Sequence, residues 1–429
     1  MSAAGRGLDS CIAVALPQTV CSASRHSREC RRKRLPAPVH SRLPEPSADE
    51  LAHSRDLVAL IRNEIAANGP LPFSRYMMLA LYAPGLGYYS AGRTKFGAAG
   101  DFVTAPELGA LYARCIARAL APSLLELGAT ADVLELGGGS GAFALAALRE
   151  WQALGVLPRR YLLLEPSADL RARQRALLEG ELPTAVAARV AWLDRPPQAS
   201  WQGIVFANEV IDALPTTRFA MRDGEVWEEH VDAGASGLRR VDRPADALVA
   251  GAVRHVEREL GEPFADGYRS EILPQLPYWL QAVAAPLERG LVLFVDYGYP
   301  RREYYLPERS DGTLVCHYRH HAHADPLHWP GLTDLTAFVD FTALAEAGVG
   351  AGFDLVGYAP QGRFLLASGL LDLVEDVADD PLEHLRRVAE VKRLTLPGEM
   401  GERFQFMAFA RGLDQALPAL RASDRSARL

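Results

Sequence analysis

A run of alternating glycines directly after an apolar segment constrains the fold of this chain more than any other feature. Residues 133–141 read Val-Leu-Glu-Leu-Gly-Gly-Gly-Ser-Gly, in the pattern E-x-G-x-G-x-G. Glycine allows sharp turns and lets a ligand approach bare backbone, where a Cβ atom would collide. Residues 142–149 have a helical pattern, so we expect the loop between a buried strand and a helix N-terminus. This arrangement predicts an α/β fold with a nucleotide-like cofactor at the strand end.

Two kinds of cofactor fit this glycine loop. Gly137, Gly139 and Ala142 also satisfy the G-x-G-x-x-G/A pattern of dinucleotide-binding folds. Glu135 favours S-adenosylmethionine, because a carboxylate at the strand end can accept hydrogen bonds from the amino group of that cofactor and would repel a pyrophosphate. A glycine-rich turn that binds no ligand is the third interpretation.

Two further acids follow apolar segments. Glu165 ends the predicted strand 161–164, where a carboxylate can hold ribose hydroxyls; alternatively, it is a surface acid that opens the helix 168–178. Asp194 follows a third strand, 189–193, and could face an adenine amino group, or it is a loop acid before two prolines.

Composition narrows the class of protein. The net charge of −7 gives no general attraction to nucleic acid, and no apolar run reaches the length of a membrane span. Five scattered cysteines, without metal-ligand spacing, indicate a reducing compartment.

Residues 1–46 carry eight basic and three acidic residues and little apolar periodicity, so we expect a disordered basic tail. Such a leader resembles an organellar transit peptide, which would place the protein in the mitochondrial matrix. The whole chain has 43 arginines and three lysines, which is typical of a GC-rich bacterial genome and favours a bacterial cytoplasm. A solvated tail or an upstream start-codon artefact is therefore the preferred interpretation of residues 1–46.

Helix signals precede the glycine loop. Ser47 and Glu50 form a capping box before an amphipathic helix that Gly69 and Pro70 end, and a second helix is expected at 73–82. Thr104 and Glu107 have the same spacing and predict a helix through Leu120. These segments predict a helical lid over residues 47–128.

A long insertion separates the later strands. The fourth strand, 203–207, and the next clear strand, 291–296, are more than eighty residues apart. Between them we expect a hairpin that turns at Asp223-Gly224 and helices at 246–260 and 274–287. Segments 353–358 and 404–410 suit an antiparallel pair at the sheet edge. The predicted units are a Rossmann-like domain (129–215 and 290–412), an inserted α+β substrate subdomain (216–289) and a C-terminal tail (413–429).

Several motifs together resemble the MidA-like class I methyltransferases, whose mitochondrial members are complex I assembly factors that dimethylate an arginine of a complex I subunit. The similarity spans roughly residues 50–412. The residues that carry it are 69–73, 81–89, 100–107, the glycine loop, 208–214, 295–298, 312–314, 318–319, 334–336 and 339–342.

The resemblance implies site residues and a cofactor. Carried over, S-adenosylmethionine would be held by Glu135, Gly137, Gly139, Gly141 and Glu165, with Asp101 and Thr104 closing over it. Asn208 and Glu209 would face the methyl group. Apart from the resemblance, Asp296 and Tyr297 at the end of the strand 291–296 could line a substrate groove, and Tyr88 and Glu107 are further candidate substrate residues.

Methylation of an arginine requires a particular orientation of its guanidinium group, which nearby residues must provide. A guanidinium must present a nitrogen lone pair in line with the sulfonium methyl, and a carboxylate can orient and polarise it. Glu209 is the first candidate for this role and Asp212, one turn away if the segment is helical, is the second. Alternatively, both acids only cap a helix after the fourth strand. Tyr297 could stack on the guanidinium or serve packing alone.

The histidines at 317, 320, 321, 323 and 328 invite a metal-site interpretation. We expect no metal, because neither a cysteine pair nor H-E-x-x-H accompanies them.

Three functions remain in competition. The first is methylation of an arginine in a partner protein, with a respiratory NADH dehydrogenase subunit as the implied substrate. The second is an assembly chaperone that keeps the cofactor fold as a binding module. The third is an NAD-dependent dehydrogenase, for which no Ser-Tyr-Lys set is recognisable. Exposed apolar patches on the insertion would permit a homodimer.

Overall fold

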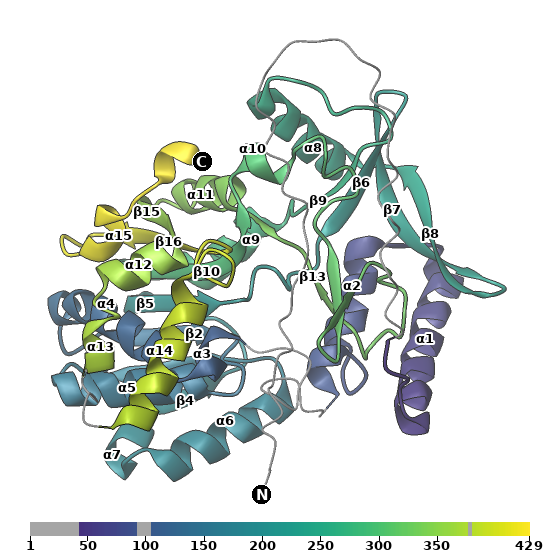
Figure 1. The fold of residues 1–429 in the computed structure, drawn as a ribbon. Helices are drawn as coiled ribbons and strands as arrows, with labels where there is room; N and C mark the ends of the chain where they lie inside the picture. Colours follow the sequence, from purple (N-terminus) through teal and green to yellow (C-terminus); the bar gives the residue numbers. More distant parts are fainter. Residues whose placement is uncertain (1–42, 92–103, 376–379) are drawn as a thin grey trace, which may run out of the picture.

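The computed structural model describes residues 43–91, 104–375 and 380–429. Nearly all of the predicted basic tail, 1–46, lies outside these described residues, and so does Asp101. The described part forms two main sheets, with the larger sheet and its helices on the left of Figure 1 and the second sheet with α1 and α2 on the right.

The larger sheet has the strand order β15-β16-β10-β5-β2-β3-β4, with β14 beside the end of β10. All strands are parallel except β16, which runs antiparallel to both of its neighbours. The predicted Rossmann-like α/β fold is thus confirmed, as is the antiparallel pair at its edge. The strands are β2 (Asp132–Leu136), β3 (Arg160–Leu164), β4 (Val190–Leu193), β5 (Trp201–Asn208), β10 (Leu287–Tyr299), β14 (Val339–Asp340), β15 (Asp354–Pro360) and β16 (Phe404–Arg411).

Helices cover both faces of this sheet, which explains why its strands are almost continuously apolar. Along β10, Leu291 and Leu293 face one helical layer, whereas Val292 and Phe294 face the other. The first layer comprises α4 (Leu111–Leu127), α5 (Ala142–Leu154), α6 (Ala168–Glu181), α7 (Thr184–Ala187), α12 (Gln361–Ala367), α13 (Asp372–Glu375), α14 (Pro381–Thr395) and α15 (Pro418–Ala422). The second comprises α9 (Leu276–Ala284) and α11 (Phe341–Gly350).

The second sheet joins the insertion to the start of the chain. Its order is β1-β7-β6-β9, with β8 also on β7, and the predicted hairpin turns at Asp223 and Gly224, both at positive φ. β1 brings Leu71 opposite Val231, and α1 and α2 pack against the same strand. The elements are α1 (Ala48–Asn68), β1 (Leu71–Pro72), α2 (Phe73–Tyr82), β6 (Thr217–Arg222), β7 (Glu225–Gly234), β8 (Gly237–Pro244), α8 (Ala247–Leu260) and β9 (Arg269–Ile272).

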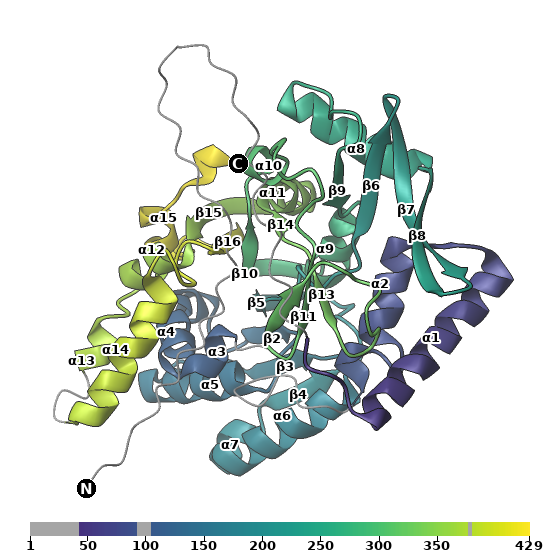
Figure 2. The ribbon, with the colours of Figure 1, turned by 45° about the vertical axis from the view of Figure 1, so that its right-hand side comes forward.

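A small third sheet lies between these parts in the view of Figure 2. It consists of β11 (Val315–Tyr318), β12 (His321–His323) and β13 (Asp334–Thr336), with β11 in the middle. Short helices complete the described chain: η1 (Tyr88–Ser90), α3 (Ala105–Leu108), α10 (Arg301–Tyr304) and η2 (Ser426–Arg428).

The capping box at Ser47 and Glu50 is confirmed by both of its hydrogen bonds. The one predicted at Thr104 is wrong: the Thr104 side chain makes no capping bond, and the helix is broken into α3 and α4. The carboxylate of Glu390, on α14, accepts from the first backbone N–H groups of α4, those of Leu111 and Tyr112. A cap supplied from so far along the chain leaves no local sequence signal.

Other boundaries also differ from expectation. The segment 47–128 is not one lid, because α1 and α2 join the second sheet while α4 packs on the larger one. The helix predicted to reach Leu287 ends at Ala284, and Leu287 begins β10. The C-terminal segment is packed, since Leu417 and Leu420 are fully buried.

Candidate active site

The glycine loop lies between β2 and α5, as predicted. Gly137, Gly139 and Gly141 all have positive φ, at 63°, 53° and 90°, which L side chains rarely adopt. The backbone N–H of Gly137 donates to the Leu164 carbonyl at 3.0 Å, and a Cβ atom on Gly137 would lie 3.0 Å from Val210. The loop therefore leaves bare backbone beside the ends of β3 and β5.

Glu135 is buried beneath this loop. Its carboxylate accepts a hydrogen bond of 2.7 Å from the Tyr161 hydroxyl. Burial, and to a smaller extent the nearby Glu165, raise the pKa of Glu135 to about 7, although the Tyr161 hydrogen bond opposes this. A cationic amino group arriving here would find a carboxylate with one hydroxyl partner.

Glu165 is also buried, at 4% exposure, so the alternative of a surface acid is wrong. Its carboxylate accepts from the Ser167 backbone N–H at 3.0 Å, and Ser167, not Glu165, caps α6. Glu135 and Glu165 thus form an acidic pair at the ends of neighbouring strands.

Gln174 is a site residue that the sequence analysis missed. Its amide donates to the Gly139 carbonyl at 2.9 Å and to the Glu165 carboxylate at 3.3 Å, and it accepts from the Trp192 indole at 2.9 Å. It occupies the buried face of α6 between Leu170 and Leu178. A glutamine in the middle of an i, i+4, i+8 apolar row is the signal that could have revealed it.

The structure also places three other predicted residues. Asp194 is 89% exposed and pairs with Arg171, whose other nitrogen donates to the Glu165 carbonyl, so Asp194 stands at the rim. Thr104 is buried just before α3. Glu107 accepts from the hydroxyl of Ser140 in the glycine loop, so the structure places this predicted substrate residue beside the cofactor loop.

Asn208 and Glu209 follow directly at the end of β5. The Tyr112 hydroxyl donates to the Asn208 side-chain oxygen at 2.5 Å, and the Asn208 amide donates to Glu209 at 3.0 Å. Glu209 has a φ of 54°, a left-handed conformation uncommon for a glutamate. Burial and the neighbouring Asp212 raise the pKa of Glu209 to about 8.

Residues 209–214 form a bend and turn, not a helix. The interpretation of Glu209 and Asp212 as helix caps is therefore wrong. The turn is held by Asp296 on β10, whose carboxylate accepts from the backbone N–H groups of Ile211, Asp212 and Tyr297 at 2.9 to 3.2 Å. This geometry makes Asp296, predicted to contact substrate, a residue that positions the turn.

Asp212 lies against Tyr297, whose hydroxyl donates to Asp212 Oδ2. Burial raises the pKa of Asp212 to about 6, although the Tyr297 hydrogen bond opposes this. Burial and the two neighbouring acids likewise raise the pKa of Asp296. Tyr297 packs edge-on against Phe338 and Phe404 and stays partly exposed.

Tyrosines from the N-terminal part adjoin this turn. The Tyr82 hydroxyl donates to the Ala213 carbonyl at 2.9 Å, and Tyr82 stacks on Tyr89, whose hydroxyl donates to Asp334 at 3.1 Å. Tyr88, the predicted substrate residue, is buried in the neighbouring core and touches Tyr89 edge-on. Tyr82, Tyr89 and Asp334 were missed, because nothing local indicates that they meet β5.

We name Glu209, Asp212 and Asp296 the acidic cluster. In the described part of the chain, no ion pair joins any of the three to Arg, Lys or His. Buried acids without a cationic neighbour keep raised pKa values and attract a cation.

Among the described residues, no group of three or more His, Cys, Asp or Glu could hold a metal ion. His323 and His328 are ring neighbours, and burial lowers the pKa of His317 to about 4. The described helices include none that is both long and apolar enough to cross a membrane.

The model of one protein family, described as "Putative S-adenosyl-L-methionine-dependent methyltransferase", matches residues 115–359, more than half of the chain. The chain belongs to this family. Its cofactor is S-adenosylmethionine, which decides between the two cofactors that the glycine pattern allowed. The positive-φ glycines and the buried carboxylates of Glu135 and Glu165 fit this cofactor.

A solved structure supports the same assignment. The methyltransferase is 43% identical to a protein of Burkholderia thailandensis that was crystallised with S-adenosyl-homocysteine. The match covers 90% of this chain and 100% of that one, with a TM-score of 0.84.

Curated relatives are more distant. The methyltransferase is 28% identical to the Drosophila melanogaster protein named protein arginine methyltransferase NDUFAF7 homolog, mitochondrial, over 86% of this chain and 88% of the relative. It is also 28% identical to the Bos taurus protein arginine methyltransferase NDUFAF7, mitochondrial, over 84% and 86% of the two chains.

Proposed function

We propose that this methyltransferase modifies an arginine side chain of a partner protein. The observation that carries the proposal is the acidic cluster, which has no ion pair among the described residues. A guanidinium carries a permanent positive charge and a planar set of donors that matches carboxylates. The cluster is therefore suited to this acceptor among common protein side chains.

The names of the curated relatives support the acceptor class. They also make a protein partner the expected substrate, and a respiratory complex I subunit is the candidate that the family resemblance suggests. Cytoplasmic or mitochondrial localisation, and a homodimer, stay predictions from the sequence.

The cofactor side of the site would hold S-adenosylmethionine through Glu135, Glu165 and the backbone of the glycine loop. When bound, this cofactor supplies an electrophilic methyl group on a sulfonium. Glu135, with its raised pKa, gains its charged form when it meets the cationic amino group. Gln174 would hold the glycine loop and Glu165 in fixed positions relative to each other, because its amide donates to both.

The acceptor side would orient the guanidinium. Glu209 accepts from one nitrogen of the arginine and is itself fixed by Asn208, which Tyr112 holds. Asp212 accepts from a second nitrogen, while Tyr297 holds its other oxygen. Methylation would leave the modified guanidinium nitrogen with one proton to lose, and the Glu209 carboxylate would receive this proton and pass it to solvent.

The test is methyl transfer to defined peptides. Purified protein is incubated with isotope-labelled S-adenosylmethionine and with matched peptides that contain Arg, Lys or citrulline at one position, and the products are read by mass spectrometry. We expect label on the Arg peptide alone. Label on Lys, or cofactor binding without transfer to any peptide, would reject the proposal, and the second result would favour the assembly chaperone.

A further inference from the structure

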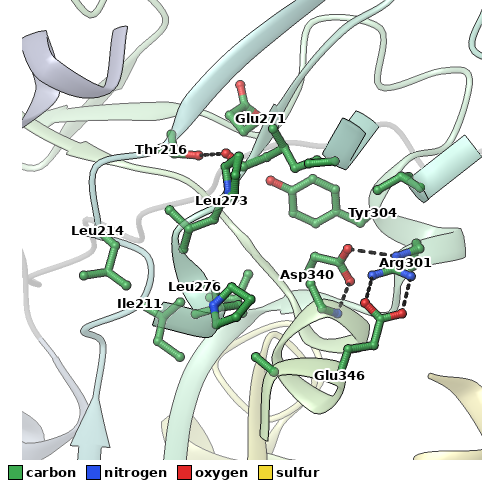
Figure 3. A pocket seen from close by; sticks show the side chains of 18 of the residues that line it. Ile211, Leu214, Thr216, Glu271, Leu273, Leu276, Arg301, Tyr304, Asp340 and Glu346 are labelled. Carbon is green, nitrogen blue, oxygen red and sulfur yellow. Dashed lines mark hydrogen bonds and ion pairs between the residues drawn. The ribbon is translucent and has the colours of Figure 1, made fainter. Parts of the chain in front are cut away.

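A cavity of about 300 Å³ lies beside the acidic cluster, between the larger sheet and the insertion. Ile211, Asp212 and Leu214 of the turn after β5 form one side of it. Figure 3 shows Ile211 and Leu214 on that side and Arg301 with Asp340 and Glu346 on the other. The cavity thus begins at a residue of the acceptor side and extends away from the glycine loop residues, none of which lines it.

The middle of the cavity is apolar. Its walls are formed by four apolar side chains: Ile272 of β9, Leu276 of α9, Val339 of β14 and Ala343 of α11. This volume is at the small end of ligand pockets, which are commonly about 300–1,000 Å³. It therefore suits one or two amino-acid side chains better than a second cofactor.

Most charges that line the cavity are already neutralised. Glu271 pairs with Arg218 at 3.1 Å, and Asp340 and Glu346 both pair with Arg301, at 3.3 and 2.6 Å. Asp212 differs, because it is 95% buried and forms no ion pair among the described residues, and its Oδ1 also has no hydrogen-bond partner there. The carboxylate that lacks a cationic partner, Asp212, is thus at the end of the cavity that adjoins the acidic cluster.

We propose that this cavity receives an apolar side chain that neighbours the target arginine in the substrate protein. This inference rests on the proposed function, since it takes the arginine to lie at Glu209 and Asp212. With the guanidinium at the open oxygen of Asp212, a flanking leucine or phenylalanine enters the apolar walls behind that residue. The cavity then selects the sequence around the arginine, while the acidic cluster selects the arginine itself.

Variants that fill the cavity test this inference. Ala252→Phe on α8 and Ala343→Phe on α11 add a ring from two different walls and leave the acidic cluster untouched. Val349→Phe, on the exposed part of α11 and outside the cavity lining, is the matched control. Thermal unfolding verifies that all three variants are folded.

The probes are fluorescein-labelled peptides with one Arg flanked on either side by Leu, Phe, Gly or Asp. Binding is measured by anisotropy in the presence of S-adenosyl-homocysteine, and transfer is measured separately with labelled S-adenosylmethionine. We expect the wild type and Val349→Phe to prefer Leu or Phe over Gly at one flanking position by about tenfold, the effect of a well-formed apolar pocket. Both filling variants should reduce this preference to within about twofold while they keep their activity on the Gly peptide.

The two hypotheses fail in different ways. Equal preference in the wild type and in both folded filling variants, or no flanking preference in the wild type, overturns the cavity assignment even if arginine is methylated. Peptide binding that depends on the cavity, without label on arginine, overturns the proposed acceptor but supports the cavity. Absence of both binding and transfer overturns both.

Discussion

The cofactor side and the acceptor side of this active site are assembled in different ways. Glu135, the glycine loop, Glu165 and Gln174 all come from β2, α5, β3 and α6, which follow one another in the chain. The acceptor side brings the turn after β5 together with Tyr82 at the end of α2, Tyr112 of α4 and Asp296 of β10. The first side can keep its geometry while the second changes, so one scaffold can retain its methyl donor and change its acceptor.

The carboxylates of the two sides also differ in their hydrogen-bond partners. Glu165 is matched by a backbone N–H and by the Gln174 amide. In the acidic cluster, Asp212 keeps one oxygen that has no hydrogen-bond partner among the described residues. A buried acid that lacks a partner is costly in the free protein, and a cationic ligand removes that cost. We therefore expect the substrate to bind at the acceptor side and to supply the missing partner.

The largest effect should come from Glu209. Glu209→Gln keeps the shape and removes the charge, so we expect kcat to fall about 10²–10⁴-fold, the range for loss of a positioned acid or base. The Kd for S-adenosylmethionine, measured by calorimetry, should stay unchanged. Glu179→Gln, an exposed glutamate on α6, is the control and should have normal kcat. Wild-type turnover by Glu209→Gln would remove this residue from the mechanism.

The complementary change on the cofactor side is Glu135→Gln. Loss of a charge-assisted hydrogen bond of about 1.5–3 kcal/mol should weaken S-adenosylmethionine binding roughly 10- to 150-fold. We expect the peptide affinity to be retained, the reverse of the result for Glu209→Gln. If both variants lost cofactor and peptide affinity alike, the division into two sides would be wrong.

The pH profiles should separate the two sides. A carboxyl group pairs with a cation only when ionised, and the pKa of Glu135 is raised to about 7 and that of Glu209 to about 8. Cofactor affinity should therefore increase as pH rises through 7, and kcat/KM as it rises through 8, about tenfold per unit below each pKa. Glu209→Gln should lack the upper inflection only. A flat cofactor affinity between pH 6 and 8 would contradict the role of Glu135.

The smallest effect is expected for Gln174→Leu. Loss of its amide leaves the Gly139 carbonyl and the Trp192 indole without their partner, which costs about 1–3 kcal/mol per buried group. We expect a lower Tm and a severalfold weaker Kd for S-adenosylmethionine, with kcat at saturation nearly normal. Gln152→Leu, at an exposed position on α5, is the control. An unchanged cofactor Kd would show that Gln174 serves packing alone.

Local sequence patterns predicted the glycine loop and the acids at the strand ends, but not the turn after β5, for a physical reason. Glycines that need positive φ and acids at strand ends are local features, and each is visible in a few consecutive residues. The break between α3 and α4 depends on Glu390, and the turn at Glu209 depends on Asp296, which are contacts over long sequence distances. The motif at 208–214 was found, but the sequence left its conformation open, because no local pattern distinguishes a turn held by a distant carboxylate from a helix.

The two-residue strand β1 has a consequence for biosynthesis. Leu71 pairs with Val231, about 160 residues further along the chain. While the protein emerges from the ribosome, α1 and α2 must wait for the hairpin before their apolar faces are covered, because β7 supplies the shared core. The apolar face of this early segment is therefore expected to stay uncovered during translation until β7 has been synthesised.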